Sequence, residues 1–345
     1  MLYATTRGKH DVVTAYKTVH VDCYGDGGLF VPFRMPKIKE EELAVLAASS
    51  QNRIIADVLN LFFSSELTEW DIEYAVGRRP SRIATVSSRL MVLECWNNPT
   101  GDVGQIVQGI SHRLRGERDG GMPTNWLNMA VRIALLFAAY GSLVSSGKIR
   151  RNVPLDVAVT TGDFAAPMAA WYARQMGLPI GKIICGCNAN GSFWDLLNRG
   201  EFPTGDTVVK TATPEADFVV PRYLERLFCA VFGVEENLRY LLKCSKGRPY
   251  FPPEDKMNDL CSGMFAAVCS DSRMASIVSG VYRTRGYILS PYAALAYGSL
   301  QDYRAITGEN GPVLLVSERS PLCDGALVSR LVRIPEAELR QHLNN

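Results

Sequence analysis

The chain has 345 residues, 47% of them hydrophobic and 21% charged, so it is long and apolar enough to bury one large core or two modest ones. The formal net charge is +2, with lysine and arginine scattered along the chain, which argues against nucleic acid and against a membrane surface as partners. Nine cysteines, mostly in apolar segments, and an N-terminus without a signal-like apolar run indicate a reducing cytoplasm, and the four dispersed histidines predict no metal site.

Two short motifs open the chain. Residues 3–8 read Tyr-Ala-Thr-Thr-Arg-Gly, and residues 26–32 read Asp-Gly-Gly-Leu-Phe-Val-Pro. In the second motif Gly27 and Gly28 allow a tight turn and Pro32 stops strand pairing, which predicts a turn that leads into an edge strand. Helical periodicity follows at 40–50, 52–63 and 68–76, with Asn52 and Thr68 as candidate N-caps. These segments predict an N-terminal helical layer.

Residues 90–94 form an apolar run typical of a buried strand, and a glycine-containing loop follows it. The loop, Thr100 to Gly104, leads into a helical pattern at 106–114, which indicates either an ordinary strand-to-helix turn or an anion site at a helix N-terminus. A polar stretch at 113–123 then connects to a long apolar helix at 129–145. Its most apolar part, 130–144, is too short to span a bilayer and contains Arg132 and Gly141, so we expect a buried helix.

The segment from 156 to 191 reads as strand, glycine loop, helix and strand. An apolar run at 157–159 ends in a loop around Gly162, a helical pattern covers 164–176, and a second apolar run lies at 182–185. Gly177 suits the end of that helix, and Pro179 prevents its continuation. A unit of this length normally joins two parallel neighbouring strands, which predicts α/β architecture. The loop is either a tight turn with Asp163 as the N-cap or an anion site at the start of the helix.

The C-terminal half continues this alternation of helices and strands. We expect helices at 193–202, 221–232, 252–271 and 273–279, and a further helix that begins near Ser290. A last strand at 312–317 precedes Glu318 and Arg319.

Five motifs in this order resemble those of the threonine synthases, which are pyridoxal-phosphate enzymes of fold type II with a tryptophan-synthase β-like fold. Residues 3–8 and 26–32 resemble the Tyr-x-Ser-Thr-Arg-Gly and Asp-Gly-Gly-Leu-Tyr-Val-Pro motifs that open these enzymes. Residues 125–128, 161–166 and 287–297 resemble the family's Asn-Ser-Ile-Asn, phosphate-loop and late-helix motifs. The resemblance implies an α/β fold with a mostly parallel sheet flanked by helices, an N-terminal segment at 1–82 and a core like the cofactor-binding large domain at 83–345.

The same resemblance marks the positions that would contact the cofactor. In the family a lysine forms a Schiff base with pyridoxal phosphate, and Gly104 holds that position here, so we expect no catalytic residue. The family's small subdomain, which holds the substrate, has no counterpart near 113–124 and is reduced or absent. The implied cofactor-binding positions are Thr161, Gly162, Asp163, Phe164, Ala165, Asn188 and Glu318.

Three of these positions differ from the family in ways that affect which ligand can bind. Asp163 replaces an asparagine of the family and adds negative charge beside the implied phosphate site, and Ala165 replaces a glycine that allows close backbone approach. Glu318 stands where the family has a threonine. It would either pair with a protonated pyridine or form a surface ion pair with Arg319.

These departures predict a catalytically degenerate threonine synthase-like protein of the cytoplasm that uses no cofactor and binds a small anionic or phosphorylated ligand or a protein partner. We also expect a homo-oligomer or a protein complex, because loss of the subdomain would expose apolar surface.

Two alternatives remain open. The first is an active threonine synthase, a pyridoxal-phosphate-dependent carbon–oxygen lyase that converts O-phosphohomoserine and water to threonine and phosphate. It would need a displaced lysine, for which the candidates are Lys148, Lys182, Lys210, Lys243, Lys246 and Lys256. The second alternative is a non-catalytic scaffold of an assembly.

Overall fold

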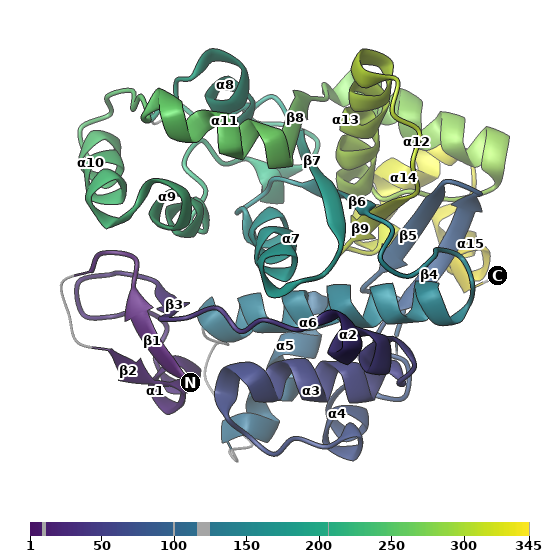
Figure 1. Cartoon of the computed structure of the whole chain (residues 1–345). Coiled ribbons are helices and arrows are strands. Elements are labelled where there is room, and N and C mark those ends of the chain that lie inside the picture. Colours follow the sequence, from purple (N-terminus) through teal and green to yellow (C-terminus); the bar gives the residue numbers. More distant parts are fainter. Residues whose placement is uncertain (9–11, 99–100, 116–124, 206, 345) are drawn as a thin grey trace.

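The main body is built on a six-stranded sheet (Figure 1), seen in a computed structural model that describes residues 1–345 except 9–11, 99–100, 116–124, 206 and 345. The strand order is β4-β5-β9-β6-β7-β8, and every neighbouring pair is parallel except β4 with β5. The strands are β4 (Arg82–Ser87), β5 (Leu90–Glu94), β6 (Leu155–Thr160), β7 (Ile180–Cys187), β8 (Met264–Val268) and β9 (Val313–Ser317). The predicted α/β fold with a mostly parallel sheet is confirmed.

Helices cover both faces of this sheet, and successive residues of a strand point to opposite faces. In β9, Leu314 and Val316 join a hydrophobic cluster with α6 (Asn125–Ser145) and α7 (Ala165–Met176). Val313 and Leu315 join a second cluster with α12 (Asp271–Arg285) and α13 (Pro291–Thr307). This burial on both faces explains why the central strands read as continuous apolar runs.

Helix α6 is the central helix of the first cluster. The helix extends beyond the apolar run at 130–144, and by length and composition alone Trp126–Ser145 could cross a membrane. The helix is nevertheless the buried core helix that we predicted, because 78% of its most apolar window is buried inside the protein. It runs between the sheet and the helices of the N-terminal layer (Figure 1).

The N-terminal layer combines a small sheet with short helices. Strands β1 (Leu2–Thr5), β2 (Val13–Thr14) and β3 (Phe30–Pro32) pair in the order β2-β1-β3, and Gly27 has the positive φ of +77° that the predicted turn requires. The helices are α1 (Ala15–His20), α2 (Glu40–Ala47), α3 (Gln51–Phe63) and α4 (Glu69–Val76). The predicted edge strand and helical layer are therefore present.

One of the two predicted N-caps in this layer was wrong. Thr68 caps α4 as predicted, because its hydroxyl accepts a hydrogen bond from the backbone of Asp71. Asn52 instead lies inside α3 and is buried, and Ser50 is the residue that caps this helix. Serine and asparagine are both good N-cap residues. Here packing selects Ser50, because the Asn52 amide donates to the carbonyl of Gly77 at 3.1 Å.

The central unit β6–α7–β7 matches the sequence pattern. Gly177 ends α7 with a φ of 110°, and β6 and β7 pair in parallel. A Cβ atom on Gly177 would also lie 2.5 Å from the carbonyl oxygen of Ile38, so only glycine fits this helix end.

The largest error in the C-terminal half concerns residues 252–271, which were predicted as one helix. The segment forms α11 (Glu254–Gly263) followed by β8, which pairs in parallel with β7. A short apolar run such as that of β8 fits a buried strand as well as a helix, and here pairing with β7 makes it a strand. The remaining helices are α5 (Val103–Arg115), α8 (Ser192–Arg199), α9 (Leu224–Phe232), α10 (Val234–Cys244), α14 (Gly325–Val332) and α15 (Glu336–Asn344).

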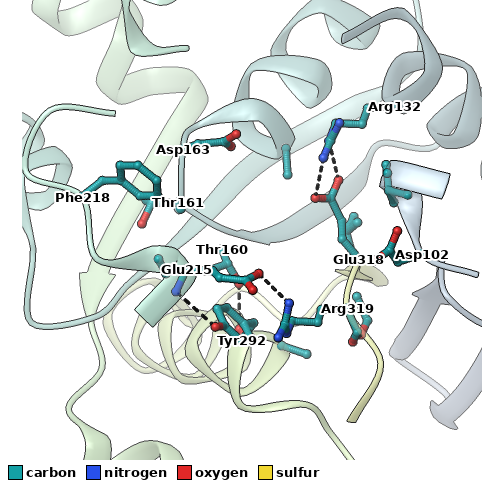
Figure 2. Close-up of a pocket in the computed structure, with 18 residues that line it drawn as sticks. Asp102, Arg132, Thr160, Thr161, Asp163, Glu215, Phe218, Tyr292, Glu318 and Arg319 are labelled. Atoms are coloured by element: carbon teal, nitrogen blue, oxygen red, sulfur yellow. Dashed lines mark hydrogen bonds and ion pairs between the residues drawn. The ribbon is translucent and has the colours of Figure 1, made fainter. Parts of the chain in front are cut away.

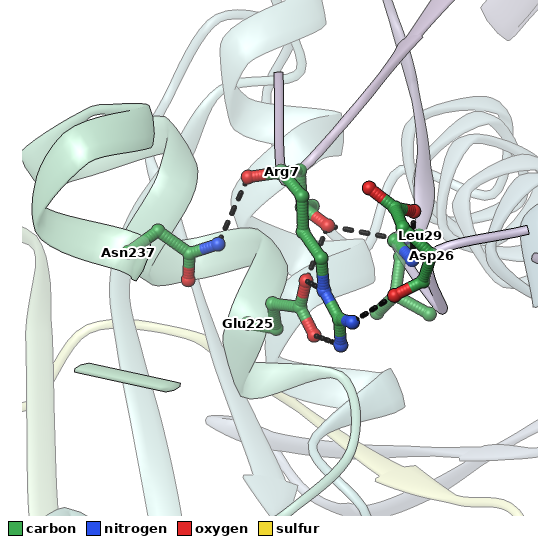
Figure 3. Close-up of polar contacts among 7 residues, drawn as sticks. Arg7, Asp26, Leu29, Glu225 and Asn237 are labelled. Carbon is green, nitrogen blue, oxygen red and sulfur yellow. Dashed lines mark hydrogen bonds and ion pairs between the residues drawn. The ribbon is translucent and has the colours of Figure 1, made fainter. Parts of the chain in front are cut away.

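A polar cluster ties the first motif of the chain to α9 and α10 (Figure 3). The guanidinium of Arg7 donates to both carboxylate oxygens of Glu225, at 3.2 and 3.3 Å, and the hydroxyl of Thr6 also donates to Glu225. The Asn237 amide donates to the carbonyl of Thr6 at 2.9 Å, and the backbone N–H of Leu29 donates to the Thr6 hydroxyl. The motif at residues 3–8 therefore joins elements far apart in the sequence.

Candidate functional site

A cavity of about 260 Å³ lies beyond the carboxyl ends of the neighbouring strands β6 and β9 (Figure 2). Open parallel sheets bind ligands at this kind of position, where chain connections diverge to opposite faces. Thr160 to Asp163 line it after β6, and Ser317 to Arg319 line it after β9. Further residues come from the starts of α5 and α13, from α6, and from a short 3-10 helix, Pro214–Ala216.

The loop between β6 and α7 has an unusual backbone. Gly162 has a φ of 45° and Phe164 a φ of 74°, and Phe164 rather than Asp163 is the N-cap residue of α7. The Asp163 carboxylate accepts a hydrogen bond from the backbone N–H of Ala165 at 2.9 Å. An N–H group at the start of α7 is thus already paired with an internal anion. Phe164, in a left-handed conformation that is rare for a bulky residue, is held by packing against Phe193 at 4.7 Å between ring centroids.

Glu318 is paired with Arg132 of α6. The Arg132 Nε and Nη2 atoms lie 2.8 and 3.2 Å from the two carboxylate oxygens, a bidentate arrangement. Burial lowers the pKa of Arg132, but Glu318 and Asp163 oppose it more strongly and hold this pKa above its usual value. Of the two alternatives for Glu318, the surface ion pair with Arg319 is therefore wrong, because Arg132 contacts both carboxylate oxygens of Glu318.

Arg319 forms a second ion pair in the same cavity. Its Nη1 atom lies 2.6 Å from a carboxylate oxygen of Glu215, and its guanidinium stacks 5.4 Å from the ring centroid of Tyr292. The Tyr292 hydroxyl accepts from the backbone N–H of Glu215, and its backbone carbonyl accepts from the hydroxyl of Thr160 at 2.7 Å. These contacts join β6, α13 and the loop after β9 into one wall of the cavity (Figure 2).

The start of α5 also lines the cavity. Asp102 and Gln105 cap the helix reciprocally, since each side chain accepts from the backbone N–H of the other at 3.1 and 2.9 Å. This pairing favours an ordinary strand-to-helix turn over a second anion site. Gly104 lines the cavity, and a Cβ atom there would meet only the Asp102 carboxylate, at 3.2 Å.

The structure brings together four of the seven implied cofactor positions. Thr161, Gly162, Asp163 and Glu318 line the cavity with Gly104. Phe164 and Ala165 are buried at the start of α7 and are not among the residues that line it.

Asn188 has a structural environment of its own. It is buried, and its amide donates to the hydroxyls of Thr211 and Thr213 and to the carboxylate of Asp217, at 2.7 to 3.2 Å. It holds the loop around residue 211 in place and does not line the cavity.

The sequence did not identify Arg132, Glu215 and Arg319 as residues of this site. A single arginine in the apolar run at 130–144 was a usable signal, because a buried guanidinium needs an acidic partner. Nothing local marked Glu215, which reaches the cavity from an irregular segment.

Comparisons with known proteins give sequence relatives for parts of the chain. A family model described as the threonine synthase N terminus matches residues 2–78. Human "Threonine synthase-like 1" is 30% identical over 175 residues, which are 50% of this chain and 24% of that protein. Threonine synthase of Pseudomonas aeruginosa is 28% identical over 185 residues, 52% of this chain and 38% of that protein. The matches therefore span less than half the length of these relatives.

Solved structures extend the likeness of the fold. Pyridoxal-phosphate-bound threonine synthase from Brucella melitensis has a TM-score of 0.84 at 17% identity, covering 99% of each chain. Yeast threonine synthase has a TM-score of 0.81 at 14% identity, covering 96% of this chain and 90% of that one. At such identities the likeness shows the fold alone.

Proposed function

Because this chain is a threonine synthase-like protein with the fold of the type II pyridoxal-phosphate enzymes, we propose that it is a catalytically degenerate relative. In this proposal the cavity after β6 and β9 binds a small polar ligand, and the protein does not use the cofactor. The activities named for its relatives are not carried over, since a fold hosts many functions and function resides in the site.

The observation that carries the proposal is the Asp163 carboxylate on the backbone N–H of Ala165. Pyridoxal phosphate needs an anion cradle at such a loop and an amine to hold it covalently. Gly104 offers no amine, and none of the described residues that line the cavity is a lysine. The residues present therefore do not fit this cofactor.

The charges of the cavity also disfavour a phosphate group. The described lining holds four acids, Asp102, Asp163, Glu215 and Glu318, and two arginines that are both engaged in ion pairs. An excess of carboxylates attracts a cation, so a ligand that carries an amine suits this cavity better than a phosphorylated one.

Three of the six lysines that could serve a displaced active site have other contacts. Lys148 donates to the hydroxyl of Thr85 at 2.9 Å, Lys182 to the carbonyl of Cys261 at 3.3 Å, and Lys256 to the carbonyl of Phe232 at 2.8 Å. None of the six candidate lysines is among the described residues that line the cavity. This supports the degenerate reading over an active threonine synthase.

The test is to incubate the purified protein with excess pyridoxal phosphate, reduce it with borohydride and map the modified peptides. We expect only scattered, substoichiometric lysine modification and no release of phosphate from O-phosphohomoserine. Stoichiometric modification of one lysine together with phosphate release would establish the lyase alternative and overturn the proposal.

A further inference from the structure

A second cavity, of about 450 Å³, lies where the connection between α4 and β4 meets the end of α6. We call it the basic cleft, because four of the described side chains that line it are cations and none is an acid. The four cations are Arg78, Arg79, Arg82 and Lys148. It is separate from the cavity after β6 and β9, with which it shares no lining residue.

Two of these cations have no acidic partner among the described residues. Arg79 is exposed and makes no ion pair or hydrogen bond there, and the Lys148 ammonium donates only to the neutral hydroxyl of Thr85, at 2.9 Å. Both charges are thus free to act on a ligand. An ammonium binds phosphate as a point charge, and a guanidinium offers a planar fork of donors to two phosphate oxygens.

The other two cations form ion pairs with acids that do not line the cleft. The Arg78 Nε atom lies 2.8 Å from Glu73, and the Arg82 Nε atom lies 3.1 Å from the buried carboxylate of Glu94. The pair of Arg78 is exposed and contributes little fixed geometry. The ion pair with Glu94, at the end of β5, fixes the orientation of the Arg82 guanidinium.

The backbone around the cleft is compatible with a bound anion. Helix α3 begins at Gln51, a lining residue, so the positive end of its dipole lies at the cleft. The negative end of α6 also lies there, but its carbonyls are occupied: Ser142 accepts from the N–H of Ser146 at 3.1 Å, and Leu143 accepts from that of Lys148 at 2.9 Å.

We propose that the basic cleft binds a small-molecule polyanion that carries at least two linked phosphate groups. A single phosphate would leave several of the four cations without a ligand contact in a cavity of about 450 Å³. A pyrophosphate moiety can contact arginine side chains with one phosphate group and Lys148 with the other. The anionic ligand that the sequence predicts would then bind in the basic cleft and not in the cavity after β6 and β9.

Calorimetric titration of the full chain with inorganic pyrophosphate at low ionic strength tests the proposal. We expect one saturable site whose affinity falls as salt is added, because the contacts are electrostatic. Arg79→Gln and Lys148→Gln should each weaken binding about tenfold. Arg248→Gln, which removes an exposed arginine remote from the cleft, is the matched control and should leave the affinity unchanged.

Three results would overturn the proposal. They are the absence of saturable binding at millimolar pyrophosphate, an equal loss of affinity in Arg248→Gln, and orthophosphate binding as tightly as pyrophosphate. Thermal melts identify a variant that fails to fold, and Arg79→Lys then takes its place, with an expected loss smaller than that of Arg79→Gln. Asp163→Asn should not change the affinity of the basic cleft for pyrophosphate, which separates failure here from failure of the proposed function.

Discussion

Asp163 is the residue that we expect to decide which ligand the cavity after β6 and β9 prefers. Its carboxylate accepts the N–H of Ala165, so an anion entering the loop would meet both a negative charge and an N–H group already in use. The neighbouring guanidinium of Arg132 does not compensate, because Glu318 takes it in a bidentate pair.

Asp163→Asn should therefore strengthen phosphate binding at this loop, on the order of tenfold, by removing one repulsive charge from a partly exposed site. Calorimetry with orthophosphate in an Arg79→Gln background measures this, since that background weakens the basic cleft. Asp102→Asn, which removes a carboxylate at the start of α5 in the same cavity, is the control and should have a smaller effect. Unchanged or weaker binding in Asp163→Asn would mean that the loop is purely structural.

Gly104 offers a second test at the same scale. A side chain fits there with a small shift, because the added Cβ atom meets only the Asp102 carboxylate at 3.2 Å. We expect Gly104→Lys to fold and to gain at most covalent binding of pyridoxal phosphate, read out by borohydride reduction and peptide mapping. It should form no threonine, because catalysis also requires a substrate positioned against the cofactor. Measurable threonine formation would show that a substrate site survives.

Single residues also show where local sequence patterns fail. Two alternatives were open for Glu318, a protonated pyridine or its neighbour Arg319, but it pairs with Arg132, 186 positions away in the chain. Asn52 was expected to cap a helix but lies inside it, and Ser50 caps instead. In both cases tertiary packing selected a partner that the local pattern does not display.

At the scale of elements, the β6–α7–β7 unit was predictable because its breaks are chemically explicit. Gly177 takes a left-handed conformation that favours glycine, and Pro179 cannot continue a helix. Strand β8 was not predictable, because its five residues carry no alternation and Gly263, which ends α11, does not by itself show that a strand follows. Its identity depends on pairing with β7, a contact that the sequence does not display.

The cluster around Glu225 gives an element-scale prediction. Glu225→Gln would leave Arg7 and Thr6 short of an anionic acceptor in a buried site, so we expect a loss of about 2 to 4 kcal/mol in the free energy of unfolding. Urea denaturation measures it. Glu235→Gln, a change to an exposed acid at the start of α10, should shift the same free energy by less than about 0.5 kcal/mol. Equal shifts in the two variants would contradict a specific role for this cluster.

At the scale of the whole molecule, the two cavities divide the charges between them. The cavity after β6 and β9 has an excess of acids, and the basic cleft has cations alone among its described lining charges. A chain with a formal net charge of only +2 thus has two cavities whose lining charges are of opposite sign in excess. This division could not be predicted from the sequence, since the charges of each site come from segments far apart along the chain.

The expected loss of the substrate subdomain falls at 113–124, of which residues 116–124 lie outside the described part of the chain. Nearby, α4 presents Trp70 and Tyr74 at 73% and 86% exposure, four positions apart and so on one face of the helix. The Nε atom of Arg113 at the end of α5 donates to Asp71 at 2.7 Å, which places this face beside the point where that connection begins.

Exposed aromatic side chains on one helix face are costly in water, and a second copy of the chain offers the same face for mutual burial. We therefore predict a dimer formed through α4, measured by light scattering over a range of protein concentrations. The double variant Trp70→Ser and Tyr74→Ser should weaken dimerisation at least tenfold, because buried aromatic residues dominate interface energies. Ile306→Ser, at an equally exposed apolar residue on α13, is the matched control and should leave the dimer intact. A strict monomer at all concentrations, or a dimer that survives the double variant, would show that this face has no such role.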